Sequence, residues 1–305
     1  MKTKGLKFDA IGTNPPYQDS SHPEKKNTLW RKFLDLSVNE LVKEGGHVGL
    51  IIPSSWMGSK KLMEEYFLPN NLLYINKDEC KRHFKVGSTF SYFVMEKGEY
   101  KHSTTIVNKQ INGKVVKSVL DLDDIVAGSM VPRDVSPICS DIVRKVLGGD
   151  FPSLGIINNT THHCVHKDRW RMMPHKEFKY PVQNTPSKLY WFNTPHIHQG
   201  QEKILIPTTT YFRRMMISTH GTTQSFGYYL VPPDIDAEIA LHNINNIVFD
   251  YINECFRYAN WNDVQVLKAL PKIPLDKKLS DEEIYEYFDL NKAEIQQITE
   301  AITWR

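Results

Sequence analysis

The first hundred residues alternate between short apolar runs and amphipathic stretches. Residues 7–13 (KFDAIGT) predict a buried strand, and residues 28–43 predict a helix whose apolar side chains recur every three or four positions. Three further apolar runs predict strands, at residues 47–53 (HVGLIIP), 71–76 (NLLYIN) and 89–96 (TFSYFVME). Because strands alternate with helices in α/β proteins, we expect a partial doubly wound sheet of parallel strands.

Beyond about residue 100 the pattern changes. Asn112-Gly113 lies between β-branched runs and predicts a hairpin. Residues 156–235 contain short strand-like runs among many polar and turn-forming residues, which indicates an irregular, mostly β region. The sequence thus divides into three predicted parts, an α/β domain at 1–125, a mixed α+β domain at 126–275 and a helical tail at 276–305.

Helices are expected near the end of the chain. The apolar periodicity predicts one helix from Ala237 to Arg257. Two pairs of residues have the spacing of a capping box, in which each partner's side chain accepts from the other's backbone N–H. These pairs are Ser280 with Glu283 and Asn291 with Glu294, and each predicts the start of a helix.

The composition is typical of a globular protein but does not identify a binding partner. The 305 residues are 40% hydrophobic and 24% charged, with a formal net charge of +3, as in globular proteins. A nucleic-acid partner is allowed, but any basic surface must be local. No apolar run reaches the length of a membrane span, and the four cysteines lack paired spacing. We therefore expect a cytoplasmic protein without membrane contact.

The turn Asn14-Pro15-Pro16-Tyr17 directly follows the first predicted strand. Two prolines end a strand and hold the turn rigid. The Asn14 amide oxygen and the Pro15 carbonyl are then two fixed acceptors beyond the carboxyl end of a strand, where open α/β sheets bind ligands. Two acceptors suit an amino group with two hydrogens, and the Tyr17 ring suits a planar base. The turn could therefore hold the exocyclic amine of a nucleobase for alkylation.

This turn closely resembles motif IV of the DNA adenine-N6 methyltransferases, particularly the gamma-type enzymes of restriction–modification systems with a C-terminal target-recognition domain. The resemblance implies that Asn14 and Pro15 hold the amino group of a flipped-out adenine, that Pro16 contacts the substrate and that Tyr17 stacks on the base. Residues 83–96 (HFKVGSTFSYFVME) resemble motif VIII of the same family. Phe84 is the aromatic residue that this second resemblance places against the other face of the base.

The same resemblance implies a fold and a cofactor. Residues 1–125 would be the carboxyl-terminal half of a Rossmann-like methyltransferase domain, and residues 126–275 a target-recognition domain. The methyl donor would be S-adenosylmethionine, whose glycine-rich motif precedes motif IV in this branch of the family. Only thirteen residues precede Asn14, and no later glycine pair has a FxGxG setting. We therefore expect an incomplete cofactor site in this chain.

Three interpretations of the incomplete site stay open. The chain could be one subunit of a split adenine-N6 methyltransferase, with a second subunit that carries the glycine-rich motif. It could be a catalytically inactive relative that binds DNA or protein in defence or counter-defence. It could also be a piece of a longer enzyme. In each case the protein would work in the cytoplasm of a bacterium, or of the host of a phage.

Basic residues next to aromatic ones predict contacts with double-stranded DNA. They are Lys167, Arg169 and Arg171, which flank Trp170, and Arg213-Arg214, which follow Tyr211-Phe212. Cationic side chains contact phosphates, and aromatic rings can reach bases. Solvated charge beside a core ring explains each residue singly about as well. Their grouping in the expected recognition domain favours DNA.

Two other clusters are weaker candidates. His162, His163, Cys164 and His166 crowd one stretch, whereas zinc ligands usually come in two separated pairs, so no metal site is predicted. Residues 54–56 (SSW) could line the mouth of the active site, although the serines could equally cap a helix.

Overall fold

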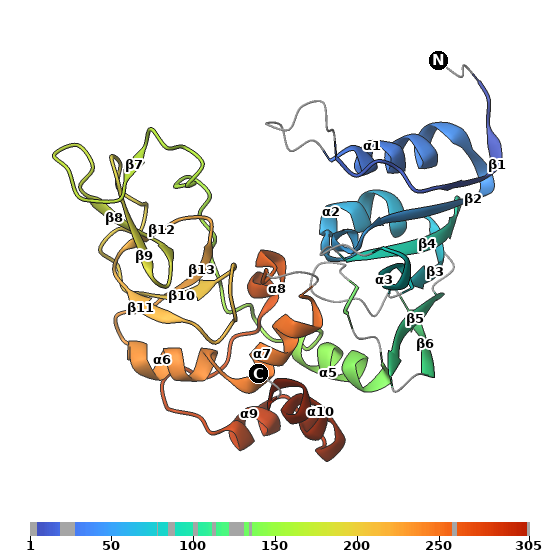
Figure 1. Cartoon of the computed structure of the whole chain (residues 1–305). Coiled ribbons are helices and arrows are strands. Elements are labelled where there is room, and N and C mark those ends of the chain that lie inside the picture. The colour runs from blue at the N-terminus through green and yellow to red at the C-terminus, as the bar shows by residue number, and fades with distance from the viewer. Residues whose placement is uncertain are drawn as a thin grey trace. The chain divides into compact units, whose positions relative to one another are not determined.

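The computed structural model (Figure 1) describes most of the chain. The described residues are 5–18, 28–77, 79–84, 89–99, 103–111, 114–121, 131–133, 136–257 and 261–303. They form two compact units, unit 1 at Met1–Ser140 and unit 2 at Asp141–Arg305, and helix α5 (Pro137–Leu147) contains the boundary. The boundary predicted at 125/126 lies outside the described residues. None of the described helices is long and apolar enough to cross a membrane.

Unit 1 is built on a six-stranded mixed sheet. In spatial order its strands are β1 (Phe8–Thr13), β2 (Val42–Pro53), β4 (Phe90–Glu96), β3 (Asn71–Asn76), β5 (Ser103–Ile111) and β6 (Lys114–Asp121). β1 is parallel to β2, and β3 is parallel to β5, whereas β4 is antiparallel to both β2 and β3. The predicted strands are present, but β1 is mostly exposed and not buried as expected, because it pairs with β2 on one side only among the described strands. The expectation of a parallel sheet was also wrong, because β4 inserts in the reverse direction between two strands that precede it.

The end of the first helix and the start of β2 agree less well with the prediction. The helix expected to reach residue 43 is α1 (Leu29–Asp35), continued by a π-helical segment, Leu36–Leu41. The chain then enters β2 at Val42 and bulges, since the register steps from Phe8 opposite Val42 to Ala10 opposite His47. Gly45 has a φ of +73°, a conformation that glycine adopts without strain. Gly45 and its neighbour Gly46 therefore lie inside strand β2.

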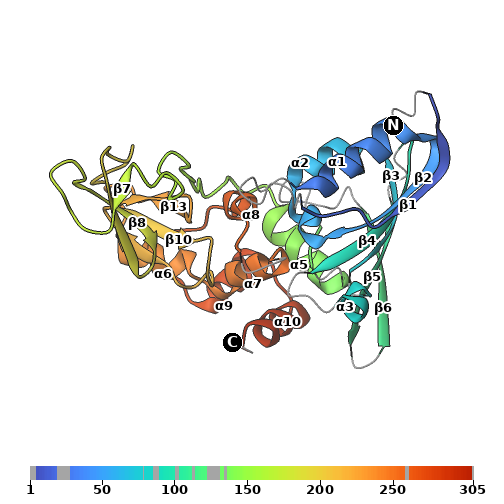
Figure 2. The same ribbon diagram turned by 45° about the horizontal axis from the view of Figure 1, so that its top comes forward.

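Helices cover the sheet of unit 1 (Figure 2). They are a 3₁₀ turn at Ser54–Gly58, α2 (Lys60–Leu62) with a π-helical extension at Met63–Phe67, and α3 (Cys80–His83). Trp56 is fully buried, contacts the rings of Phe67 and Phe93, and donates from Nε1 to Ser91 Oγ at 2.9 Å. Trp56 is therefore a core residue and does not line the mouth of a site.

Unit 2 contains two small sheets. The three-stranded sheet has the order β11 (Met216–Ser218), β10 (Lys203–Pro207) and β13 (Phe226–Leu230), all antiparallel. The four-stranded sheet has the order β12 (Gly221–Thr222), β8 (Tyr180–Thr185), β9 (Lys188–Phe192) and β7 (Trp170–Arg171). The mostly β character expected for residues 156–235 is confirmed, with short strands joined by long connections (Figure 1).

The helices of unit 2 are α6 (Ala237–Ile244), α7 (Ile247–Cys255), α8 (Val264–Ala269), α9 (Asp281–Tyr287) and α10 (Lys292–Thr303). The single helix expected from 237 to 257 is thus two helices. The side chain of Asn246 accepts from the backbone N–H of Phe249 at 2.8 Å, which caps a new helix and ends the old one. The capping boxes of Ser280 and Asn291 are both confirmed.

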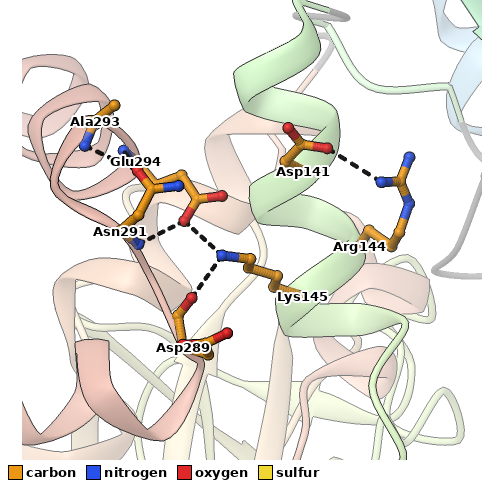
Figure 3. Close-up of polar contacts among 7 residues, drawn as sticks. All are labelled: Asp141, Arg144, Lys145, Asp289, Asn291, Ala293 and Glu294. Carbon is orange, nitrogen blue, oxygen red and sulfur yellow. Dashed lines mark hydrogen bonds and ion pairs between the residues drawn. The ribbon is translucent and has the colours of Figure 1, made fainter.

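A partly buried ion pair attaches α10 to α5 within unit 2 (Figure 3). Lys145 Nζ lies 2.9 Å from Glu294 Oε2 and donates to the backbone carbonyl of Asp289 at 2.6 Å. The same Glu294 oxygen accepts from the N–H of Asn291 at 2.7 Å, as part of the capping box. The Glu294 side chain is 3% exposed, so one buried carboxylate serves both the helix start and the contact with α5.

Candidate functional site

Four chain segments meet at one edge of the sheet in unit 1, namely the edge formed by the ends of the strands. The carboxyl ends of the parallel strands β1 and β2 lie at this edge. The antiparallel strand β4 begins there, with Phe90 opposite Pro53 at the end of β2. β3 runs in the same direction as β2, so α3 and Phe84, which follow β3, come off the sheet at the same edge. The proline turn that follows β1 is therefore placed among three neighbouring chain ends.

The Asn14-Pro15-Pro16-Tyr17 turn folds back on itself. Tyr17 donates its hydroxyl proton to Asn14 Oδ1 at 2.5 Å. Asn14 and Pro16 are exposed, Pro15 is buried and Tyr17 is half-buried. Among the described residues, no donor bonds the Pro15 carbonyl and no second group bonds the Asn14 side chain. The turn thus presents one free carbonyl and one amide oxygen that still has a lone pair to offer.

An aromatic group lies beside this turn. The Tyr17 ring stacks on Phe90, with centroids 4.7 Å apart and planes 26° apart. Phe84 lies on Phe90 as well, at 5.6 Å and 54°. Tyr17 and Phe84 thus both contact Phe90, which the sequence interpretation counted only as a strand residue. Its position as the first apolar residue of the strand after Phe84 was the available signal.

The environment of the Tyr17 hydroxyl is partly dry. Burial is the largest cause that raises the pKa of Tyr17 above its ordinary value, and the nearby Cys80 thiol adds to it, whereas the hydrogen bond to Asn14 opposes it. Tyr17 therefore stays a neutral donor at physiological pH. A neutral phenol can hold the amide oxygen in place without adding charge next to an uncharged base.

The arrangement suits an amino group on a flat ring. The Pro15 carbonyl and the Asn14 amide oxygen can accept one hydrogen each. Pairing both hydrogens of an aromatic amine favours a pyramidal nitrogen, whose lone pair then points away from the two acceptors. The rings of Tyr17 and Phe84 provide apolar faces for a base at the same edge of the sheet.

Comparison with known protein families finds a match for the region that contains this turn. Residues 2–79 match the family model of the Eco57I restriction-modification methylases. This segment contains the whole Asn14–Tyr17 turn and the first three strands of the sheet. The match supports a methylase-related role for this part of the chain. No curated protein matches the chain.

Two solved structures of restriction-modification proteins are also similar. One is the type IIL enzyme MmeI in complex with DNA, with 9% sequence identity over 88% of this chain and 45% of that one, at a TM-score of 0.46. The other belongs to a type I restriction-modification system, with 16% identity over 36% of this chain and 26% of that one, at a TM-score of 0.29. The chain thus spans less than half of either protein, and at these TM-scores neither likeness establishes a shared fold.

The described residues do not fit the methyl donor that methylases use. A cofactor site of this kind needs a glycine-rich turn between a strand and a helix. Gly45 and Gly46 lie within β2, Gly221 and Gly227 lie in strands of unit 2, and Gly148 follows a helix. Within the described ranges no glycine pair occupies a strand-to-helix turn.

The predicted DNA contacts of unit 2 lie on two different sheets. Lys167 and Arg169 are exposed in the connection that leads to β7. Arg213 and Arg214 are exposed in the connection that leads to β11 of the other sheet. Among the described residues, none of these four cations has a carboxylate within ion-pair distance, so each charge is available to a phosphate.

Arg171 differs from the other cations. Its guanidinium carbon lies 4.3 Å from the centroid of the Phe178 ring, and its Nη1 donates to the carbonyls of Lys167 and Trp170. Trp170 in turn stacks flat on Tyr190, at 4.1 Å and 5°. These contacts give Arg171 a part in holding the loop, in addition to the DNA contact predicted for it.

Of the histidine-rich stretch only His162 lies in the interior of unit 2, whereas His163 and Cys164 are half-buried and His166 is exposed. His162 is 5% exposed and bonds Thr194 O at 3.2 Å, and the Cys164 thiol accepts from Gln224 at 3.3 Å. His196, from a distant part of the sequence, lies with its ring centroid 5.4 Å from that of His162. In the part of the chain that the structure describes, no group of three or more His, Cys, Asp or Glu side chains is arranged to bind a metal.

Proposed function

We propose that the chain is a component of a site-specific DNA adenine-N6 methyltransferase that holds a flipped-out adenine. The observation that carries the proposal is the turn at the end of β1, with the free Pro15 carbonyl, the Asn14 amide oxygen and the Tyr17 ring at one edge of the sheet. The match of residues 2–79 to a restriction-modification methylase family supports it.

In this proposal the two acceptors bind the adenine amino group. Asn14 Oδ1 takes one N6 hydrogen and the Pro15 carbonyl takes the other. Tyr17 stacks on one face of the base, Phe84 covers the other, and Pro16 keeps the turn rigid. The residues of this chain supply position and orientation, which is how most of a transfer barrier can be lowered without a general base. A duplex must extrude the adenine first, because its amino group is paired inside the stack.

Unit 2 would grip the duplex as a target-recognition domain. Lys167, Arg169, Arg213 and Arg214 place exposed positive charges on a β-rich scaffold, which suits contacts to phosphates. Such contacts fix the position of the duplex, and groove contacts choose the sequence.

A second polypeptide would bring the methyl donor, S-adenosylmethionine. Among the described residues β1 pairs with β2 only, so the other side of β1 has no neighbouring strand. Leu6 and Phe8 beside this edge are 59% and 44% exposed. An open edge with exposed apolar side chains invites another strand. We assign the glycine-rich motif to a partner that continues the sheet past β1.

Methyl transfer with a labelled donor tests the proposal. The chain is purified from its native source together with bound proteins, incubated with labelled S-adenosylmethionine and genomic DNA lacking the modification, and the nucleosides are identified by mass spectrometry. We expect N6-methyladenine from the complex and none from the chain alone. A complex that carries a glycine-rich partner yet makes no N6-methyladenine would contradict the proposal and favour a non-catalytic DNA-binding role. Saturable donor binding by the chain alone would contradict the assignment of the donor to a partner.

A further inference from the structure

We propose that Phe90 is a positioning residue that fixes the orientation of the Tyr17 ring before a base binds. The inference rests on the proposed function, because it concerns how the same site receives an adenine. It assigns a role to a buried residue at the beginning of β4.

The first step concerns how Tyr17 is held. Its hydroxyl is bonded to Asn14 Oδ1 at 2.5 Å, and its backbone carbonyl accepts from the N–H of Leu29 at 3.1 Å. The ring face is held by Phe90, in a nearly parallel stack at 4.7 Å. Three contacts from three segments thus fix the hydroxyl, the backbone and one face.

The second step concerns Phe90 itself. It is 7% exposed and lies opposite Pro53 in the register of β4 and β2. The N–H of Ser54 donates to the carbonyl of Thr89 at 3.0 Å, which ties the beginning of β4 to the end of β2. Phe90 therefore belongs to the rigid sheet, whereas Tyr17 belongs to a turn. The stack transfers the rigidity of the sheet to the turn.

The third step concerns Phe84. It contacts Phe90 from another segment, at 5.6 Å, so the two rings proposed to enclose the base both rest on one support. A support of this kind sets the positions of Tyr17 and Phe84 relative to each other. Preorganised rings lose less conformational freedom when a ligand binds, which raises affinity without a new contact.

The consequence is a selective loss when the Phe90 ring is removed. Phe90→Leu keeps an apolar side chain in the strand but takes away the stack. Aromatic pairs contribute about 0.5–1.5 kcal/mol beyond their burial, so the preference for adenine should fall by about two- to twelvefold. Contacts to the rest of the DNA do not involve Phe90, and affinity for DNA without adenine should stay unchanged.

The test uses the full chain and short duplexes that need no recognition sequence. One duplex carries an adenine opposite an abasic site, which is already unpaired and therefore easily extruded. Its twin carries a thymine at that position, which has no amino group. Fluorescence anisotropy gives the ratio of the two dissociation constants, here named the adenine preference. We expect the native chain and Phe90→Tyr to keep the preference and Phe90→Leu to lose most of it.

Phe93→Leu is the matched control. It makes the same change on the same strand, but Phe93 contacts Trp56 and Phe67 and not Tyr17. We expect Phe93→Leu to lower stability and leave the adenine preference intact. If Phe90→Leu folds poorly, Phe90→Met serves in its place. An unchanged or increased preference in the Phe90 variants would overturn the inference, and an increase would show that Phe90 occupies the place of the base.

A second measurement separates this inference from the proposed function. In the native chain with labelled tyrosines, the ring current of Phe90 should shift the Tyr17 ring protons upfield, and Phe90→Leu should remove that shift. This result does not depend on DNA. A native chain with the shift but no adenine preference would refute the proposed function alone. A preference that survives removal of the shift would refute the role of Phe90 alone.

Discussion

The two units place their candidate residues in opposite ways. In unit 1 three of them, Asn14, Pro15 and Tyr17, lie within four consecutive residues, and a rigid turn at the end of one strand sets their geometry. In unit 2 the candidate cations are spread over two segments and two sheets. A contiguous motif can be found from sequence because local backbone geometry sets its chemistry. A dispersed surface depends on the packing of distant segments.

The interiors of the units differ as well. Unit 1 buries aromatic rings around Trp56 and Phe93. Unit 2 buries two basic side chains, His196 at 2% exposure and Lys203 at 0%. Lys203 donates to the backbone carbonyls of Gln201 and His220. Burial lowers the pKa of His196 to about 3 and that of Lys203 to about 8. In unit 2, burial therefore opposes protonation of both His196 and Lys203.

The largest effect should come from the Asn14–Tyr17 turn, which we propose holds the base. Asn14→Ala removes one of two acceptors for the amino group, and removal of a comparable transition-state hydrogen bond costs about 10²–10³ in rate. Methyl transfer by the assembled enzyme should fall by that factor, while DNA affinity changes little. The control is Asn39→Ala, an exposed helix residue that bonds Asp35. Equal rates for Asn14→Ala and the native enzyme would remove unit 1 from the chemistry.

Acid should destabilise unit 2 first. His196 accepts from the N–H of His198 on Nδ1 and lies near Thr222, His162, Tyr228 and Lys203, so its folded form is neutral. The unfolded chain binds a proton near pH 6.5, and the folded chain does not until about pH 3. Stability should therefore be full above pH 6.5 and fall below it, by at most about 1.4 kcal/mol per pH unit for this group.

Peptide-resolved hydrogen exchange at pH 7.5 and 5.5 reads the two units separately. We expect protection to fall in β8, β10 and β12 and to hold in β2 and β4. His196→Gln should flatten the pH dependence, whereas the exposed His47 in unit 1 should be replaceable without effect. An equal decrease in both units would remove the contrast between the interiors.

Loss of the ion pair between Lys145 of α5 and Glu294 of α10 should have an intermediate effect on stability. Lys145→Met takes away two hydrogen bonds and leaves the buried Glu294 carboxylate with the Asn291 N–H only. The free energy of unfolding of unit 2 should fall by about 1–2 kcal/mol. Urea unfolding monitored by hydrogen exchange measures this change, with the exposed Lys292→Met as control. Protection of the sheet in unit 1 should not change, and a decrease there would mean that the two units unfold together.

The smallest effects should come from single surface charges. Lys167→Gln with Arg169→Gln should weaken DNA binding by about two- to tenfold and lower the slope of log affinity against log salt by about one for each phosphate that the variant no longer neutralises. The adenine preference should not change, since these residues act on phosphates. Lys278→Gln, an exposed cation elsewhere in unit 2, is the control. A drop in adenine preference would show that the cations also position the base.

Much of unit 1 could be predicted from the sequence. Strands β1, β3 and β4 lie within a residue or two of the expected runs because apolar patterning and proline breaks are local signals. Both capping boxes were predictable for the same reason. The broken helix at Asn245-Asn246 was not, because apolar periodicity continues through it while an asparagine side chain caps a new helix.

By itself, the sequence determined the rigid acceptor turn at Asn14–Tyr17, the alternation of strands and helices, and the basic and aromatic composition of the later region. Only the tertiary structure decided the order of the strands, with β4 reversed between β2 and β3, and so brought Phe90 beneath Tyr17 and Phe84. The tertiary structure also decided which basic side chains are buried in unit 2. The physical reason is that strand pairing and burial depend on contacts between residues far apart in the chain, which no local pattern encodes.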